Sequence, residues 1–251
     1  MTKPSPRILE VENITDITPN MRRITLGGEG IKDFPAEQES AYIKLIFTQD
    51  TGQKPIMRTY TIIQQRDHEI DVDFVLHGLN HQGAEGPASE WAKTTEIGDS
   101  IMIGGPGPKK SINHEADWFL LAGDMTALPA ITVNLAQLPA DAVGYAVIEV
   151  LNEDDIQSLK KPKNIEIEWV VNAQASNSYY PLLERVKTLS WLDGVPAIWA
   201  ACEFNSMRAL RRYFKEKEVS KTHLYISSYW KLDNSEDEHK VIKRQDAEES
   251  L

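Results

Sequence analysis

The chain has 251 residues, of which 41% are hydrophobic and 26% are charged, and its formal net charge is −11. This composition excludes collagen-like, coiled-coil and wholly disordered chains, and the acidity argues against a nucleic-acid partner. No apolar run approaches the roughly 18 residues of a membrane-spanning helix, and the N-terminus lacks a signal-peptide stretch. A single cysteine, Cys202, excludes an internal disulfide. We therefore expect a cytoplasmic monomer without a membrane partner, whose redox chemistry would need an organic cofactor.

The first part of the chain predicts six short strands, separated by Gly, Pro, Asp or Asn, at residues 8–14, 22–26, 41–47, 58–64, 69–77 and 100–103. Six strands at this close spacing favour an antiparallel barrel or a sandwich. Residues 87–93 interrupt the series as a short helix that opens at Gly86-Pro87. We expect this β-domain to cover residues 1–113.

After the Gly- and Pro-rich segment 104–108, continuously apolar strands alternate with helices. Strands are expected at residues 118–122, 145–150, 165–171, 197–201 and 224–229, and helices at 127–138, 181–191 and 206–218. The alternation predicts a doubly wound parallel sheet over residues 114–232, which binds ligands beyond the carboxyl ends of its strands. Residues 233–251 form a charged extension, either helical or flexible.

A barrel followed by a nucleotide-type domain is a layout that holds a flavin, and residues 57–62 (Met-Arg-Thr-Tyr-Thr-Ile) suit such a cofactor. Alternation along a strand puts Arg58 and Tyr60 on one face and Thr59 and Thr61 on the other. A flavin needs an aromatic surface, a hydroxyl or backbone donor and a cation, and this segment has all three. An ordinary half-buried strand is an equally open interpretation.

A second motif begins at Gly86 and predicts a pyrophosphate cradle at the start of the short helix. Helix starts present unpaired N–H groups, Ala88 allows close approach of a phosphate, and the Ser89 hydroxyl adds a donor. The alternative is a plain capped helix.

Between these two motifs lies a strand whose positions Asp71, Asp73, Val75 and His77 share one face. We expect this row to face a ligand. A zinc site that pairs His77 with His81 is rejected, because the intervening residues do not favour a helix.

Residues 123–131 predict a buried strand end, a glycine turn and a helix start, where Gly123 and Thr126 can receive a phosphate. Residues 104–111 lack the glycine before the lysine that a triphosphate-binding loop requires, and the chain has no Gly-x-Ser-x-Gly elbow. A nucleotide triphosphatase and a serine hydrolase are therefore excluded, and no catalytic acid, base, nucleophile or metal is expected.

Residues 57–62, 71–78, 86–92, 123–131, 199–203 and 229–230 have the order and spacing seen in siderophore-interacting proteins, and the chain resembles that family over nearly its whole length. The resemblance implies an FAD-dependent ferric-siderophore reductase with a ferredoxin-reductase-like fold. In that fold a six-stranded antiparallel Greek-key β-barrel for FAD precedes the doubly wound nucleotide domain. The implied product is Fe(II), released in the cytoplasm for iron assimilation.

The motifs and the resemblance together imply that the residues at the FAD are Arg58, Thr59, Tyr60, Thr61, Asp73, Val75, His77, Gly86, Ala88, Ser89 and Thr126. The resemblance places the nicotinamide nucleotide at Asp124, Thr126, Ala127 and Glu203. Met125, Cys202 and Ser228 depart from the family pattern on the nicotinamide side, so a ferredoxin stays open as an alternative donor.

Acidic residues at positions 149–155 follow the second strand of the nucleotide domain and would repel a 2′-phosphate, which favours NADH over NADPH. Lys160, Lys161 and Lys163 come soon after and leave the opposite preference open. Ferric siderophores, whether catecholate or hydroxamate, are expected to be anionic here, and the candidate residues for binding them are Lys44, Lys109, Lys110, Lys231, His239 and Lys243. Lys44 is preferred, and His239 would be charged below about pH 6.5.

Two other functions stay open at this stage. One is a general NAD(P)H-dependent flavin or ferric-chelate reductase, for which siderophores are incidental. The other is a non-catalytic siderophore-binding protein, against which the flavin motifs argue.

Overall fold

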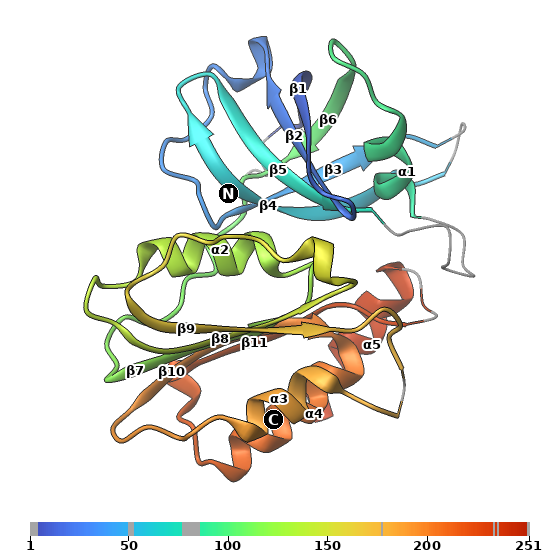
Figure 1. Cartoon of the computed structure of the whole chain (residues 1–251). Coiled ribbons are helices and arrows are strands. Elements are labelled where there is room, and N and C mark those ends of the chain that lie inside the picture. Colours follow the sequence, from blue (N-terminus) through green and yellow to red (C-terminus); the bar gives the residue numbers. More distant parts are fainter. Residues whose placement is uncertain are drawn as a thin grey trace. The chain divides into compact units, whose positions relative to one another are not determined.

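The computed structural model describes residues 5–49, 53–76, 86–176, 178–232, 234 and 236–249. The chain forms two units that divide after Lys110, where the sequence predicts a boundary near residue 113 (Figure 1). The first unit is built of strands and one short α-helix, and the second is a sheet covered by helices. Among the described residues, no helix is both long and apolar enough to cross a membrane.

Six antiparallel strands close the first unit into a barrel, in the order β1-β2-β5-β4-β3-β6. They are β1 (Arg7–Thr18), β2 (Met21–Gly27), β3 (Tyr42–Phe47), β4 (Ile56–Arg66), β5 (Glu69–Val75) and β6 (Ser100–Gly104). The predicted barrel is confirmed and the sandwich is excluded. A 3₁₀ turn, η1 (Glu29–Ile31), follows β2, and helix α1 (Pro87–Thr94) lies between β5 and β6 in the chain.

The interior of the barrel is apolar because side chains alternate between the two faces of each strand. Leu9, Ile43, Leu45 and Phe74 have no exposed surface, and they belong to one cluster that the small residues of α1 also join. Burial of one face of α1 on this cluster holds the helix against the barrel.

The second unit contains a five-stranded parallel sheet in the order β11-β10-β7-β8-β9. Its strands are β7 (Trp118–Gly123), β8 (Val143–Val150), β9 (Asn164–Val171), β10 (Pro196–Glu203) and β11 (Leu224–Trp230). Helix α2 (Leu128–Gln137) covers one face, and α3 (Pro181–Thr188) and α4 (Phe204–Glu216) cover the other (Figure 1). The predicted doubly wound sheet is confirmed, and its strand order reverses between β7 and β10, the position where such sheets bind ligands.

The charged extension takes the helical of its two expected forms, as α5 (Glu236–Glu249). This helix packs on β11 and buries His239 and Asp246. The Asp246 carboxylate pairs with Arg208 and Arg211 of α4, at 3.2 and 2.5 Å. Two 3₁₀ turns, η2 (Glu153–Asp155) and η3 (Lys221–His223), complete the unit.

Candidate functional site

The flavin motif lies on β4 with regular alternation. Thr59 pairs with Lys44 of β3 and Thr61 pairs with Tyr42, whereas Tyr60 pairs with the fully buried Ile43. The only register shift between β4 and β5 lies beyond the motif, between Ile62 and Gln64. Arg58 and Tyr60 therefore share the inner face and the two threonines share the outer face, as the sequence predicts.

Tyr60 is half-buried and packs on an aromatic neighbour from β5. The centroids of the Tyr60 and Phe74 rings lie 4.4 Å apart, with the ring planes inclined by 35°. Phe74 also contacts Trp91 of α1, at 5.6 Å between centroids. The proposed flavin surface and the proposed phosphate helix thus share one buried ring. The sequence motifs did not single out Phe74 or assign Trp91 a role.

The start of α1 has the geometry of an anion-binding site. Gly86 is extended, Pro87 opens the helix, and the N–H groups of Ser89 and Glu90 donate to the Gly86 carbonyl. Ser89 is only 6% exposed and its Oγ has no hydrogen-bond partner, although buried hydroxyls are nearly always paired. A buried donor without a partner, at the positive end of a helix, fits a phosphate group of a bound cofactor.

Arg22 of β2 fixes the other end of α1. Its Nη1 donates to the carbonyls of Ala92 and Lys93, at 3.0 and 3.3 Å, and Nε and Nη2 bind the Asp16 carboxylate. A cation at the last carbonyls also interacts favourably with the helix dipole. Arg22 of β2 therefore helps to hold α1, and with it the proposed phosphate cradle, in place on the barrel.

The row expected to face a ligand on β5 is bound by arginines instead. Asp73 accepts two hydrogen bonds from Arg23, at 2.7 and 2.8 Å, and Asp71 accepts from Arg66 and Thr25. Burial raises the pKa of Asp73, and the Arg23 guanidinium opposes that rise.

Val75 of the same row is partly exposed, and His77 lies outside the described residues. Sequence analysis missed Arg23, because β2 and β5 are neighbours only in the closed barrel, where the register places Arg23 directly opposite Asp73.

In the second unit, Asp124 directly follows β7, and its side chain forms hydrogen bonds with residues at the ends of β10 and β11. Its buried carboxylate accepts from the N–H and hydroxyl of Thr126, at 3.0 and 2.5 Å, from the Glu203 N–H, at 2.9 Å, and from the Trp230 indole, at 2.8 Å. Burial raises the pKa of Asp124, and these four donors oppose the rise. Gly123 is required before it, because a Cβ there would lie 2.6 Å from the Ala201 carbonyl oxygen.

These bonds correct the expectation that Thr126 receives a phosphate. Both of its donors are occupied by the Asp124 carboxylate, which also places an anion where the phosphate was expected. Ala127 is fully buried and precedes α2. Asp124 thus organises the edge of the sheet, a role that sequence analysis missed together with that of Trp230.

Glu203 has a comparable structural role at the end of β10. It caps α4, because its Oε2 accepts from the N–H groups of Asn205 and Ser206, at 2.6 and 3.0 Å. Its Oε1 accepts from the Leu232 N–H at 3.2 Å. The side chain thereby ties the segment after β11 to the start of α4.

Glu149, near the end of β8, is a third, partly buried carboxyl group close to Asp124 and Glu203. Burial raises its pKa to about 7, with Asp124 and Glu203 adding to the rise and the Asn172 amide opposing it. Asn172 Nδ2 donates to Glu149 Oε1 at 2.9 Å. The charge of the edge therefore changes near neutral pH.

The six expected siderophore-binding residues divide between the units. The first unit contains Lys44, half-buried between Thr59 and Gly104, together with Lys109 and Lys110 after the Gly-Pro corner. The second unit contains the other three around β11. There the Lys231 ammonium lies 5.0 Å from the centroid of the Phe204 ring, and Lys243 donates to Ser227 Oγ and the Ser228 carbonyl, at 2.7 and 2.8 Å.

His239 is wrong as an exposed cation. It is 3% exposed, and its Nε2 lies 2.8 Å from Ser228 Oγ. Burial lowers its pKa to about 4, with Lys243, Lys231 and Lys240 adding to the effect. The side chain is neutral at pH 6.5 and serves to dock α5 on β11.

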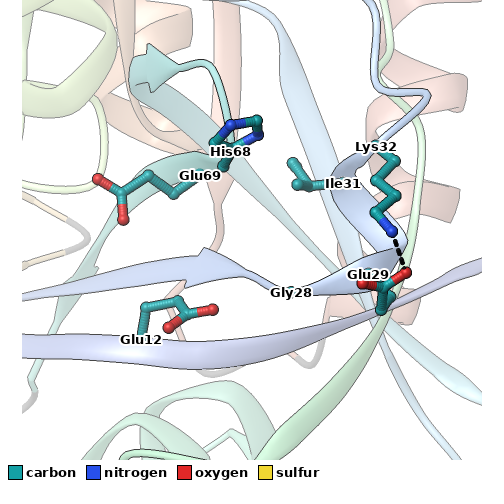
Figure 2. A pocket seen from close by; sticks show the side chains of 7 residues that line it. All are labelled: Glu12, Gly28, Glu29, Ile31, Lys32, His68 and Glu69. Carbon is teal, nitrogen blue, oxygen red and sulfur yellow. Dashed lines mark hydrogen bonds and ion pairs between the residues drawn. The ribbon is translucent and has the colours of Figure 1, made fainter.

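A separate hollow of about 360 Å³ lies at the surface of the barrel (Figure 2). Its charged side chains are mostly acidic, and its Lys32 is ion-paired with Glu29. It is lined by Glu12, Gly28, Glu29, Ile31, Lys32, His68 and Glu69. No residue of the flavin motifs lines it, and its charge disfavours anionic ligands. No metal-binding cluster is present among the described parts of the chain.

The barrel, the doubly wound sheet and the motifs on β4 and α1 define the class: an FAD-dependent oxidoreductase with a ferredoxin-reductase-like fold. The fold is shared with a Plasmodium falciparum ferredoxin-NADP⁺ reductase (TM-score 0.65, 14% identity, covering 90% of this chain and 97% of that one). The model of the siderophore-interacting FAD-binding domain matches residues 10–55 and 48–110, and that of the siderophore-interacting protein matches residues 116–233.

The chain belongs to the siderophore-interacting protein family. It is 31% identical to the ferric vibriobactin reductase ViuB of Vibrio cholerae, with 92% of each chain covered. It is also similar to the crystal structure of the siderophore-interacting protein SipS from Aeromonas hydrophila. That similarity has a TM-score of 0.84 and 32% identity, and it covers 97% of this chain and 98% of the other.

Proposed function

We propose that this protein is a ferric-siderophore reductase that passes electrons from NADH through FAD to an iron chelate and releases Fe(II) in the cytoplasm. The observation that carries the proposal is the unpaired, buried Ser89 hydroxyl at the start of α1, the helix whose Trp91 packs on the same Phe74 ring as Tyr60 of β4. The similarity to a ferric vibriobactin reductase supports the substrate class.

The residues fit the two halves of FAD. Gly86, Ala88 and Ser89 would hold the pyrophosphate, and the partly exposed ring of Tyr60 would contact the isoalloxazine. Bound FAD supplies the conversion between a two-electron hydride donor and a one-electron metal acceptor. The protein's own part is to position the ring and to bind the chelate, for which no acid, base or nucleophile is required.

Two features of the second unit favour NADH over NADPH. Glu153 and Asp154 are exposed just after β8, where the adenosine ribose of a dinucleotide lies in such sheets. Lys161, which sequence analysis left open as a countercharge, donates instead to the Ile165 carbonyl at the start of β9, at 2.5 Å. The 2′-phosphate of NADPH would therefore meet acidic groups without a countercharge from Lys161. A ferredoxin is the alternative donor.

Lys44 is the first candidate for the anionic chelate, with Lys109 and Lys110. Lys44 lies on the same outer face as Thr59 and opposite Gly104, which has no side chain and so leaves room for a ligand. A general ferric-chelate reductase is the second candidate function, and it would not depend on these cations. A non-catalytic siderophore carrier is a third possibility that the FAD-binding domain argues against.

The test measures Fe(II) formation under anaerobic conditions with a ferrous-specific chromogenic chelator. The substrates are a ferric tricatecholate and a ferric trihydroxamate siderophore, each offered with NADH, NADPH or reduced ferredoxin. We expect FAD-dependent Fe(II) formation with NADH, and a several-fold higher KM for the tricatecholate in Lys44→Gln. Lys217→Gln is the control. A rate that does not require FAD would contradict the proposal.

A further inference from the structure

Three aromatic rings from three elements of the barrel unit contact one another in series: Tyr60 on β4 packs on Phe74 of β5, and Phe74 packs on Trp91 of α1. Phe74, the middle ring, has no exposed surface, whereas the outer two are partly buried. The separations of 4.4 and 5.6 Å are those of interacting aromatic pairs.

The two outer rings lie on the elements that would hold opposite halves of FAD. Tyr60 belongs to the strand proposed to carry the isoalloxazine, and Trp91 lies two residues after Ser89 on the helix proposed to carry the pyrophosphate. Ala88 and Ala92, on the same helix, are buried in the same cluster. The two small side chains allow the helix to approach the barrel closely.

Packing in protein interiors is dense, so a buried ring constrains the positions of both of its neighbours. If Phe74 is replaced by a smaller side chain, Tyr60 and Trp91 each lose a contact, and the distance between strand and helix is less tightly constrained. Affinity for a ligand that must satisfy both elements depends on such preorganisation.

We propose that Phe74 is a positioning residue that fixes the isoalloxazine-binding strand and the pyrophosphate-binding helix relative to each other, so that both halves of FAD bind at once. This inference rests on the proposed function for the identity of the cofactor. Phe74 touches neither half itself. It acts through Tyr60 on one side and through Trp91 on the other.

The experiment measures binding of FAD, riboflavin and ADP to the full-length apoprotein, without electron donor or siderophore. Riboflavin carries the ring without the pyrophosphate, and ADP carries the pyrophosphate without the ring. We expect Phe74→Leu to weaken FAD binding about ten-fold or more, equivalent to about 1.4 kcal/mol per factor of ten. Riboflavin and ADP should each bind several-fold more weakly, and quenching of bound-flavin fluorescence should decrease.

Phe214→Leu is the matched control, because Phe214 is equally buried but lies in the second unit. It should lower the melting temperature comparably and leave the three affinities unchanged. Trp91→Leu should weaken ADP more than riboflavin, and Trp91→Phe, which retains a ring, should restore ADP binding.

The inference is overturned if Phe74→Leu weakens FAD no more than Phe214→Leu does, or if it weakens only one of the two fragments. These outcomes are distinct from failure of the proposed function. A wild-type protein that binds no FAD would refute the function, whereas normal binding with no effect of Phe74→Leu would refute only the positioning role.

Discussion

Ser89 is the residue at which the structure and the proposed cofactor meet most directly. Its hydroxyl is buried without a partner, so the apoprotein gains nothing from it and loses its hydration. A bound phosphate would supply the missing acceptor. Such a residue lowers the stability of the free protein and raises its affinity for the ligand, as expected of a residue that serves binding.

We therefore expect Ser89→Ala to separate stability from binding. FAD affinity should fall about ten- to a hundred-fold, because hydrogen bonds to charged groups contribute about 1.5–3 kcal/mol. The unfolding free energy of the apoprotein should stay unchanged or rise by about 0.5–1 kcal/mol, since an unpaired hydroxyl is removed. Flavin titration and denaturant unfolding measure the two quantities.

Ser40 provides the control, because its hydroxyl is also buried and unpaired but does not lie at a helix start. Ser40→Ala should leave FAD affinity unchanged. Equal loss of affinity in both variants, or loss of stability in Ser89→Ala, would argue against a phosphate at α1.

Glu149 allows a second prediction at the level of a single residue. Its folded pKa of about 7 lies above the unfolded value of 4.5, so its contribution to stability is fully present below pH 4.5 and is lost as the pH rises through 7. Glu149→Gln, which is neutral throughout, should raise the unfolding free energy at pH 8 by about 1–3 kcal/mol.

At pH 4.5 the same substitution should have little effect, and denaturant unfolding at the two pH values measures the difference. Glu166→Gln, at an exposed position of β9, is the control and should show no such pH dependence. A loss of stability at pH 8 in Glu149→Gln would mean that the charged form is favoured by the fold.

Individual site residues were predicted unevenly. Ser89 and Tyr60 could be proposed because their chemistry follows from local position, one at a helix start and one on a strand. The distant partners of Asp73, Asp124 and Glu203 could not, because Arg23, Trp230 and Leu232 approach these carboxylates only in the folded sheets. Local sequence does not state which donor will reach a buried carboxylate.

At the scale of elements, the stability of the C-terminal helix α5 is expected to respond to acid through His239. His239 docks it on β11 in the neutral form, with a folded pKa of about 4 against an unfolded value of 6.5. The unfolded state therefore takes up a proton first as the pH falls. The stability that neutral His239 provides is present above pH 6.5 and is lost progressively towards pH 4.

We expect the amides of α5 to lose hydrogen-exchange protection between pH 6.5 and 4, by an amount equivalent to as much as about 3 kcal/mol, after correction for the intrinsic exchange rate. His239→Gln should flatten this dependence, because glutamine does not titrate. His114→Gln, at an exposed position, is the control. Protection of α5 that is independent of pH in the wild type would contradict the assignment.

The helices and strands themselves were predictable, because the spacing of hydrophobic residues along the sequence differs between the two kinds of element. The alternation of residues 41–47 and 69–75 predicts barrel strands, and the apolar runs at 118–122 and 197–201 predict central strands of a parallel sheet. The extension at 233–251 was ambiguous, because its sequence is polar and the buried side chains His239 and Asp246, which dock the helix, are polar themselves.

At the scale of the whole molecule, the proposed function assigns FAD to the barrel and a nicotinamide nucleotide to the parallel sheet. Sequence order and motif spacing predict both units, since each is built from local strand and helix patterns. The need for a flavin follows from the number of electrons transferred, because a hydride donor gives two electrons and ferric iron accepts one. The central claim is therefore that one bound FAD connects these two partners.

A single-turnover experiment tests this claim most directly. FAD-loaded protein is reduced anaerobically with one equivalent of NADH and then mixed with an excess of ferric tricatecholate siderophore, while flavin absorbance and ferrous iron are recorded together. The account predicts complete reoxidation of the flavin with two Fe(II) formed per FAD, in step with the change in absorbance. Flavin that stays reduced while the siderophore stays ferric would contradict it.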